Sequence, residues 1–154
     1  MTNNQIGRGE TMDKLWTNEF TFVTIINLAL FIGFQMLNAP FPFFIKALGG
    51  DEAIAGVATG LFAVASVMMR PGIGWILDTF GRKLILVIGM VGMLLLPLSY
   101  AITTALTLVI VLRALHGIMW SAASTAINTV ACDIIPRSRF GEGMGMFSIG
   151  TAIA

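Results

Sequence analysis

The stretch GWILDTFGRK, residues 74–83, places an acid, a glycine and two bases between two long apolar runs. The chain has 154 residues, of which 56% are hydrophobic and 11% are charged, whereas soluble domains average about 25% charged residues. A surface that faces water requires more charge than this, so we expect a lipid bilayer to surround most of the chain. The charged stretch is therefore expected to lie at a membrane surface, between two membrane-spanning helices.

The apolar segments predict an all-α, polytopic membrane protein. A helix that crosses the hydrocarbon core of about 30 Å needs about 20 predominantly apolar residues. Four segments meet this requirement, at about 20–44, 53–77, 84–103 and 105–134, and a fifth runs from 143 to 154. Because this fifth segment would reach only about 18 Å as a helix, we expect it to be incomplete and the chain to be a fragment. Residues 1–19 are expected to form a cytoplasmic tail, since the apolar run after them is too long for a cleaved signal peptide.

The basic residues predict the orientation of these spans. Loops on the cytoplasmic side carry an excess of lysine and arginine. With the amino terminus inside, the outer side receives only Lys46, whereas the cytoplasmic side receives Arg8, Lys14, Arg82, Lys83, Arg137 and Arg139. We therefore expect a multi-pass protein of the cytoplasmic membrane, with its amino terminus and residues 74–83 in the cytoplasm.

Each residue type in the stretch 74–83 has a mechanical use. Gly74 would let another helix approach closely. Asp78 would end the second span, where its carboxylate can accept N–H bonds from the start of a neighbouring helix. Gly81 permits the positive φ that a short reversal often needs, and Lys83 would hold the loop on the cytoplasmic side.

Arg82 is expected to reach a second carboxylate. Asp133 ends the fourth span on the same side of the membrane, so Asp78, Arg82 and Asp133 are expected to form a charge cluster. A generic loop that merely follows the positive-inside rule would need the bases, but neither the acid nor the glycine spacing.

The pattern Gly-x-x-x-Asp-x-x-Gly-Arg-Lys resembles the signature loop of the major facilitator superfamily of secondary transporters. RALHGIMWS, residues 113–121, is similar to the family's fourth-span motif. DIIPRSRFGEGMG, residues 133–145, resembles the junction between the fourth and fifth spans of bacterial drug-exporter-like members. The resemblance covers the chain from about residue 20 to its end.

This resemblance implies two six-helix halves that rock around a central substrate cavity. The chain would supply the first four spans and part of the fifth, and its missing partner would be the carboxy-terminal half of the transporter. The expected activity is export of a small molecule of unknown identity, coupled to protons and without a cofactor, and the chain is not expected to transport alone. The resemblance also implies that the signature loop is a latch, whose aspartate meets a helix of the second half while the transporter faces outward.

Polar residues on one face of the fourth span form the second candidate site. A charge deep in a membrane helix is costly and usually faces a cavity or a partner. Spacings of 4, 4, 3 and 4 place a stripe of polar and small residues on one helical face, namely Arg113, Gly117, Ser121, Ser124 and Asn128. The stripe is interpreted as a cavity lining, with Arg113 in coupling or substrate binding as the resemblance implies. A packing seam of small residues is the alternative.

Further polar residues lie within the spans, and those of interest are Asn27, Gln35, Asn38, Arg70 and His116. Gln35 and Asn38 are three positions apart in the first span, where they can contact substrate or form interhelical hydrogen bonds. Arg70 is expected to extend its guanidinium toward the cytoplasm. His116 titrates in a useful range, but a structural role beside tryptophan is favoured over proton coupling.

Other function classes fit the sequence less well. An intramembrane enzyme needs clustered catalytic residues, whereas the two candidate acids, Asp78 and Asp133, lie at helix ends. A single cysteine, Cys132, excludes an internal disulfide and a cysteine-based metal cage. The net charge of +1 gives no reason to expect a nucleic-acid partner, and a phosphate-binding Gly-rich loop is missing from the sequence. A non-transporting membrane protein or the product of a decayed gene is the alternative.

Overall fold

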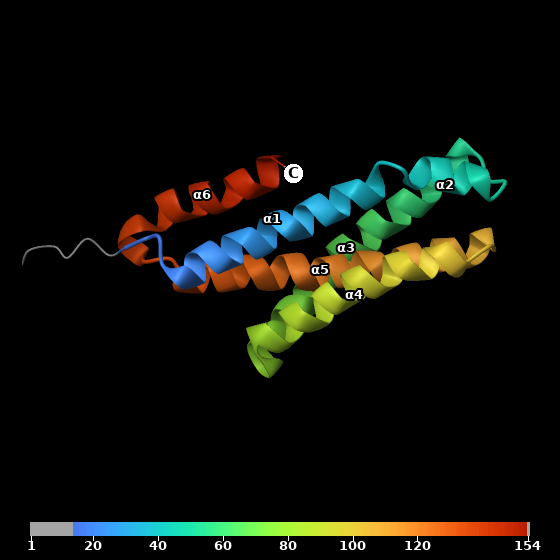
Figure 1. Cartoon of the computed structure of the whole chain (residues 1–154). Helices are drawn as coiled ribbons and strands as arrows, with labels where there is room; N and C mark the ends of the chain where they lie inside the picture. Colours follow the sequence, from blue (N-terminus) through green and yellow to red (C-terminus); the bar gives the residue numbers. More distant parts are fainter. Residues whose placement is uncertain (1–13, 154) are drawn as a thin grey trace, which may run out of the picture.

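The computed structural model describes residues 14–153, and every regular element in that range is helical (Figure 1). In chain order these elements are α1 (Asn18–Asn38), α2 (Phe41–Ala47), α3 (Glu52–Phe80), α4 (Arg82–Ile102), α5 (Leu106–Ile134), the 3-10 turn η1 (Arg137–Arg139) and α6 (Phe140–Ile153). Four segments are long and apolar enough to cross a membrane: Asn18–Ala47, Glu52–Phe80, Arg82–Ile102 and Leu106–Ile134. The predicted all-α membrane fold is confirmed for the described residues.

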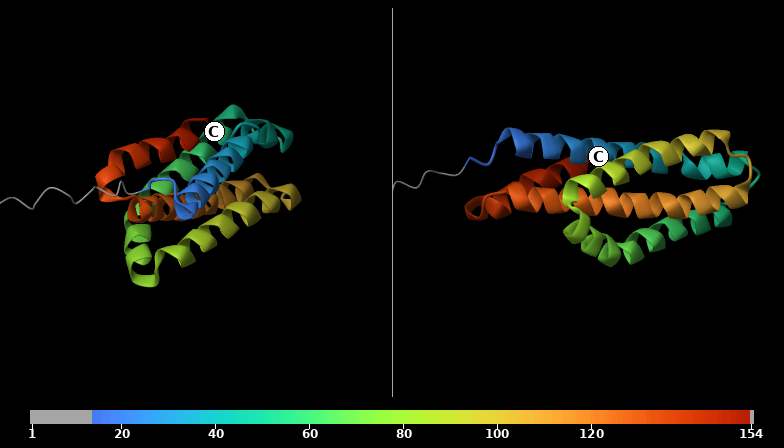
Figure 2. Two further views of the ribbon diagram at one scale, coloured as in Figure 1. Left: turned by 60° about the vertical axis from the view of Figure 1, so that its left-hand side comes forward. Right: turned by 90° about the horizontal axis from the view of Figure 1, so that it is seen from below.

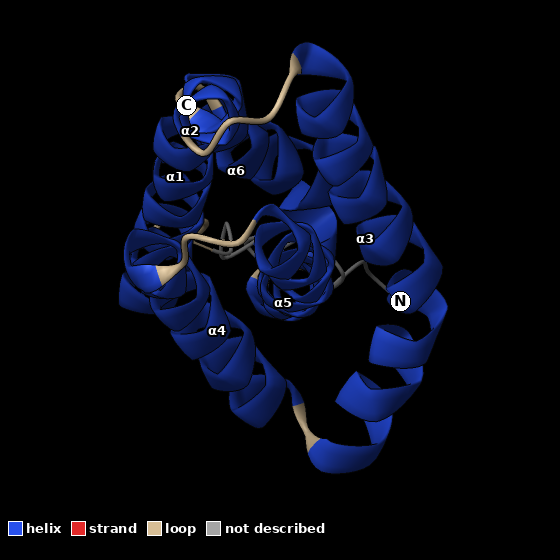
Figure 3. Ribbon diagram, turned by 90° about the vertical axis from the view of Figure 1, so that its right-hand side faces the viewer, coloured by secondary structure: helices blue, strands red, loops and turns tan. Residues whose placement is uncertain are grey.

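Helix α5 runs through the middle of the bundle, with α1, α3 and α4 around it (Figure 3). Glycines allow the closest approaches between these helices. A Cβ atom added to Gly117 would lie 2.4 Å from the Phe62 carbonyl oxygen of α3, and one added to Gly89 of α4 would lie 2.5 Å from the Ala123 backbone nitrogen. Small residues at helix crossings are the usual basis of tight packing between membrane helices, so α5 is the element on which the other spans are assembled.

The first predicted span is two helices in the structure. Helix α1 ends at Asn38 and α2 begins at Phe41, whereas the sequence predicts one segment over 20–44. The physical cause is a pair of prolines, because Pro40 and Pro42 lack the N–H groups that would continue the helical hydrogen bonding. Pro42 instead occupies the first turn of α2, where an N–H has no helical partner anyway.

A single residue, Gly81, separates α3 from α4. Its φ of 90° and ψ of 146° lie in a region that glycine adopts without steric cost, so the chain reverses there without a longer loop. The helices are consequently longer than the predicted spans 53–77 and 84–103. Asp78 lies inside the last turn of α3 rather than at its end, and Arg82 and Lys83 form the first turn of α4.

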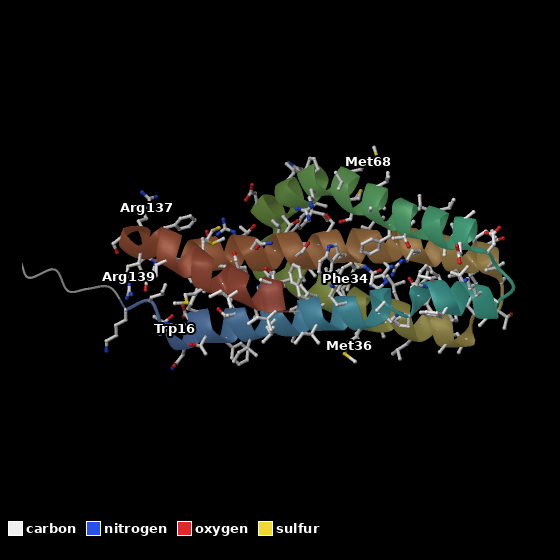
Figure 4. All side chains as sticks on the ribbon, turned by 90° about the horizontal axis from the view of Figure 1, so that it is seen from above. Trp16, Phe34, Met36, Met68, Arg137 and Arg139 are labelled. Atoms are coloured by element: carbon white, nitrogen blue, oxygen red, sulfur yellow. The ribbon has the colours of Figure 1, made fainter. Side chains whose placement is uncertain are left out.

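The outer surface of the bundle is apolar. Met36 and Met68 are each 74% exposed and point away from opposite sides of the bundle, whereas Phe34 points inward (Figure 4). Large exposed apolar side chains such as these are suited to contact with lipid tails, because lipid tails are as apolar as the side chains themselves.

Helix α6 packs along α1 (Figures 1 and 2). It begins at Phe140, three residues before the predicted start of the fifth span, because the turn η1 leads directly into it. Asn27 of α1 is fully buried at this contact and donates a hydrogen bond from Nδ2 to the Phe147 carbonyl at 3.4 Å. A polar anchor therefore fixes α6 against the first span.

Candidate functional site

Arg113 of α5 is enclosed by its neighbours and has no exposed surface. Its Nη2 donates a hydrogen bond to Oδ1 of Asn38, the last residue of α1. Its guanidinium carbon lies 4.1 Å from the centroid of the Phe41 ring and 4.7 Å from that of the Phe62 ring, so two aromatic faces stabilise the charge. Within residues 14–153, Nε and Nη1 have no hydrogen-bond partner.

Tyr100 of α4 and His116 of α5 extend this polar group. The Tyr100 hydroxyl lies 3.1 Å from His116 Nδ1 and also interacts with Arg113. His116 is fully buried, and its ring meets Phe62 edge-on with centroids 5.6 Å apart. Residues from the first four spans thus converge, and we call them the Arg113 cluster: Asn38, Phe41, Phe62, Tyr100, Arg113 and His116.

Sequence reasoning did not identify half of the Arg113 cluster. Tyr100 is the only tyrosine in the chain, and a hydroxyl within an apolar span was an available signal that a hydrogen-bond partner lies nearby. Phe41 and Phe62 gave no signal, because phenylalanine in a membrane span is ordinary.

The other members of the α5 stripe lie mainly in contact with protein. Gly117 abuts Phe62, and Ser121 and Ser124 are buried. Ser124 Oγ donates to the Trp120 carbonyl at 2.7 Å, which is a hydrogen bond within α5 itself. Asn128 is exposed and donates to the Ser124 carbonyl at 2.7 Å. Among the described helices, Gly117 therefore serves the α3–α5 crossing, while Arg113 has partners on the four helices α1, α2, α3 and α4.

Gln35 and Asn38 do not act together in the structure. Asn38 contacts Arg113, whereas Gln35 is exposed and its side chain makes no hydrogen bond within residues 14–153. A cavity of about 550 Å³ lies between α1 and α4, and its lining includes Phe34, Pro97 and His116. Apart from His116 this lining is apolar, so the cavity borders the Arg113 cluster without containing the stripe.

The second candidate site lies where α3 turns into α4. Arg82 Nη1 donates to Asp133 Oδ2 near the end of α5, and this ion pair is half exposed at both side chains. Asp78 borders the same depression, which Leu77, Gly81 and Arg82 also line. In residues 14–153, Asp78 has neither a hydrogen bond nor an ion pair from its carboxylate, so the structure brings Arg82 to Asp133 but leaves Asp78 without a partner.

Gly74 and Lys83, the other candidate residues of the stretch 74–83, lie away from the neighbouring helices. A Cβ on Gly74 would meet nothing within 4 Å, so none of the described helices uses the close approach that this glycine allows. Lys83 is exposed. Arg70, which lies two turns of α3 before Asp78, is also exposed, so α3 carries polar groups on a surface that the described helices leave uncovered.

An ion pair closes the junction between α5 and α6. Arg139 Nη2 and Nε donate to the Glu142 carboxylate at 2.7 and 2.9 Å. These hydrogen bonds lower the pKa of the Glu142 carboxyl. Both side chains are partly exposed to solvent, so the pair orients the turn η1 without adding much stability. No group of His, Cys, Asp or Glu within the described range is arranged to hold a metal ion.

Comparisons with known proteins give a consistent set of relatives. A sequence profile of the Major Facilitator Superfamily matches residues 23–154. Quinolone resistance protein NorA of Staphylococcus aureus is 24% identical over 132 residues, which cover 85% of this chain and 34% of NorA. An uncharacterized MFS-type transporter of Methanocaldococcus jannaschii is 25% identical over 138 residues, which cover 89% of this chain and 35% of the relative. The chain thus spans about a third of the length of these relatives, and no solved structure matches it significantly.

Proposed function

The chain belongs to the Major Facilitator Superfamily. From this premise we propose that it is the amino-terminal part of a secondary transporter, which moves a small molecule across the cytoplasmic membrane by alternating access. The proteins of this family that it resembles are transporters and not enzymes. The chain alone is expected to be inactive, because the described spans are few and the relatives are about three times as long.

The proposed direction is export, and the proposed driving force is a proton gradient. NorA is named for resistance to quinolones, which supports an exporter of small amphipathic compounds. The proposed orientation places the amino terminus in the cytoplasm. One end of the bundle carries Arg82, Lys83, Arg137 and Arg139, and the positive-inside rule assigns this basic end to the cytoplasmic side.

One observation carries the assignment of the site: the guanidinium of Arg113 is fully enclosed among spanning helices and has only neutral partners there. A charged group in this setting is costly and marks a pathway or a coupling site more often than a packing contact. We assign Arg113 to substrate binding or coupling, with the exposed residues Gln35 and Asn128 facing the pathway once the remaining helices are in place.

The Arg82–Asp133 pair is assigned to gating at the cytoplasmic end. Asp78 and Gly74 lie on the uncovered surface of α3 beside this pair. A helix from the second half would cover that surface and receive the Asp78 carboxylate at its positive end. The latch would hold the cytoplasmic side closed and release as that side opens.

The test is transport by proteoliposomes under an imposed proton gradient. The full-length transporter that begins with this chain should move a fluorescent amphipathic dye against its gradient, and the movement should stop when a protonophore dissipates the proton gradient. The 154-residue chain reconstituted alone should move none. Dye movement that ignores the protonophore would exclude proton coupling, and a full-length protein that moves no dye or other amphipath would favour a non-transporting membrane protein.

A further inference from the structure

The Arg113 guanidinium has hydrogen-bond donors that the described residues do not use. It is 0% exposed, and two of its three nitrogens, Nε and Nη1, have no acceptor within residues 14–153. The third donates to the amide oxygen of Asn38. A buried donor without an acceptor is costly, and the cost rises when the group is charged.

The charge of Arg113 is also uncompensated. All the ion pairs of the described chain involve other basic residues, and the immediate neighbours of the guanidinium are two phenylalanine rings, an amide and a tyrosine hydroxyl. Aromatic faces attract the cation but do not supply hydrogen-bond acceptors for its N–H groups. A carboxylate is the group that meets both needs, because it carries the opposite charge and accepts two hydrogen bonds from one guanidinium.

Space for the rest of such a ligand adjoins the Arg113 cluster. A cavity of about 270 Å³ is lined by Leu37, Pro40, Phe41, Phe44 and Tyr100, and nearly all of its lining is apolar. Phe41 and Tyr100 belong to both the cavity and the cluster. An apolar ring system in this cavity would therefore lie one side chain away from Arg113.

The cover over Arg113 lies at the break between two helices. Asn38 ends α1 and Phe41 begins α2, and these two residues contact the guanidinium from either side of the break. Ala39 and Pro40 between them are exposed. Phe41 is thus the side chain that separates the cavity from the guanidinium, and a change of its rotamer would join the two.

We propose that the Arg113 cluster binds the carboxylate of an amphipathic organic anion, with the apolar part of the anion in the cavity beside Phe41 and Tyr100. This inference rests on the proposed transport function for its biological meaning, since it names the substrate class of that site. The binding itself can be measured without transport.

The experiment uses energy transfer from Trp120 to an anthracene probe. Trp120 stacks on Phe34 with centroids 4.1 Å apart, and Phe34 stacks on Phe62 of the cluster at 5.4 Å. Replacing the other two tryptophans, Trp16 and Trp75, which are 57% and 67% exposed, with phenylalanine leaves one donor close to the site. The 154-residue chain in phosphatidylcholine nanodiscs is then titrated with 9-anthracenecarboxylate and with the isosteric 9-anthracenemethanol.

The carboxylate should bind at least about tenfold more tightly than the alcohol, which is the usual gain from a charge-assisted hydrogen bond. Arg113→Gln should abolish this preference. Arg70→Gln removes the other membrane-embedded arginine, which is exposed, and should retain the preference. Equal affinity for the two probes in the chain that keeps Arg113 and Arg70 would overturn the proposal even if Arg113→Gln did not fold. An equal loss of the carboxylate preference in Arg113→Gln and Arg70→Gln would also overturn it.

A second titration, on the full-length transporter, shows whether the partner of Arg113 is a soluble ligand or a carboxylate side chain of the protein itself. If a carboxylate of the full-length transporter fills the site, the longer protein should lose the preference that the 154-residue chain shows, and this result would also overturn the proposal. Dye transport with no carboxylate preference would leave the proposed transport function standing and remove only the inference. A carboxylate preference without transport would support the binding inference and overturn the proposed transport function.

Discussion

Arg82, the first residue of α4, forms an ion pair with Asp133, which lies one residue before the end of α5. The pair joins two helices that are 51 positions apart at these residues. It also lies beside Asp78, whose carboxylate has no partner in the described part of the chain. One end of the bundle therefore contains both a completed ion pair and an acid that is available to another helix.

Reversing the charge of Arg82 should impair transport more than it impairs folding. The side chains of the pair are 42% and 40% exposed, and exposed pairs contribute about 0–1 kcal/mol to stability. Arg82→Asp in the full-length transporter should therefore leave the melting temperature nearly unchanged while transport falls, and adding Asp133→Arg should restore part of it. Arg137→Asp is the matched control, since Arg137 is exposed and outside the ion pairs of the described chain. Normal insertion of both variants without any rescue would contradict a gating role for the pair.

Glycine at position 89 should be required for the α4–α5 crossing. A Cβ there would lie 2.5 Å from the Ala123 nitrogen and 2.8 Å from its Cα, so the backbone of α5 would have to move. Gly89→Ala should destabilise the chain by about 1–3 kcal/mol, as overpacking does. Gly60→Ala in α3 meets nothing within 4 Å and should be neutral or stabilising by up to about 1 kcal/mol. Thermal unfolding in detergent micelles compares the two variants, and equal stability would mean that this crossing is loosely packed.

The orientation can be tested with single cysteines. Glu52 at the start of α3 and Thr79 near its end are both exposed, and Cys132→Ser removes the native thiol. With the amino terminus inside, a membrane-impermeant maleimide added to intact cells should label Glu52→Cys and spare Thr79→Cys. Cell lysis should make both reactive. The reverse labelling pattern would place the stretch 74–83 outside and exclude the proposed cytoplasmic latch.

The sequence was a reliable guide wherever one helix or one turn decides the structure. Gly81, Arg82 and Asp133 are local features of helix ends, and helix length alone brings the last two to the same end of the bundle. The family resemblance of the stretch 74–83 is likewise confirmed by the match over residues 23–154. The prolines at 40 and 42 were visible as well, but their spacing did not distinguish a kink from the break that the structure has.

The surroundings of Arg113 were not predictable in the same way. Its partners come from four other helices, α1 to α4, and nothing in the local sequence of Phe41 or Phe62 distinguishes a ring on a guanidinium from a ring in lipid. The 3.6-residue period correctly places Arg113 and Gly117 on neighbouring parts of α5. It does not say which helix covers each residue, and that choice decides whether a position packs, as Gly117 does, or holds a charge.

Transport by the Arg113→Ala variant of the full-length transporter tests the central claim most directly. The measurement is proton-driven dye movement in proteoliposomes, normalised to the amount of inserted protein, with Arg70→Ala as the control for loss of a membrane-embedded arginine. Because Arg113 has no carboxylate partner in the described bundle, its removal leaves no acid stranded, and the variant should insert normally. We predict that Arg113→Ala abolishes transport or uncouples it from the proton gradient, while Arg70→Ala has a smaller effect. Unchanged transport and coupling in Arg113→Ala would contradict the account and reduce the α5 stripe to a packing seam.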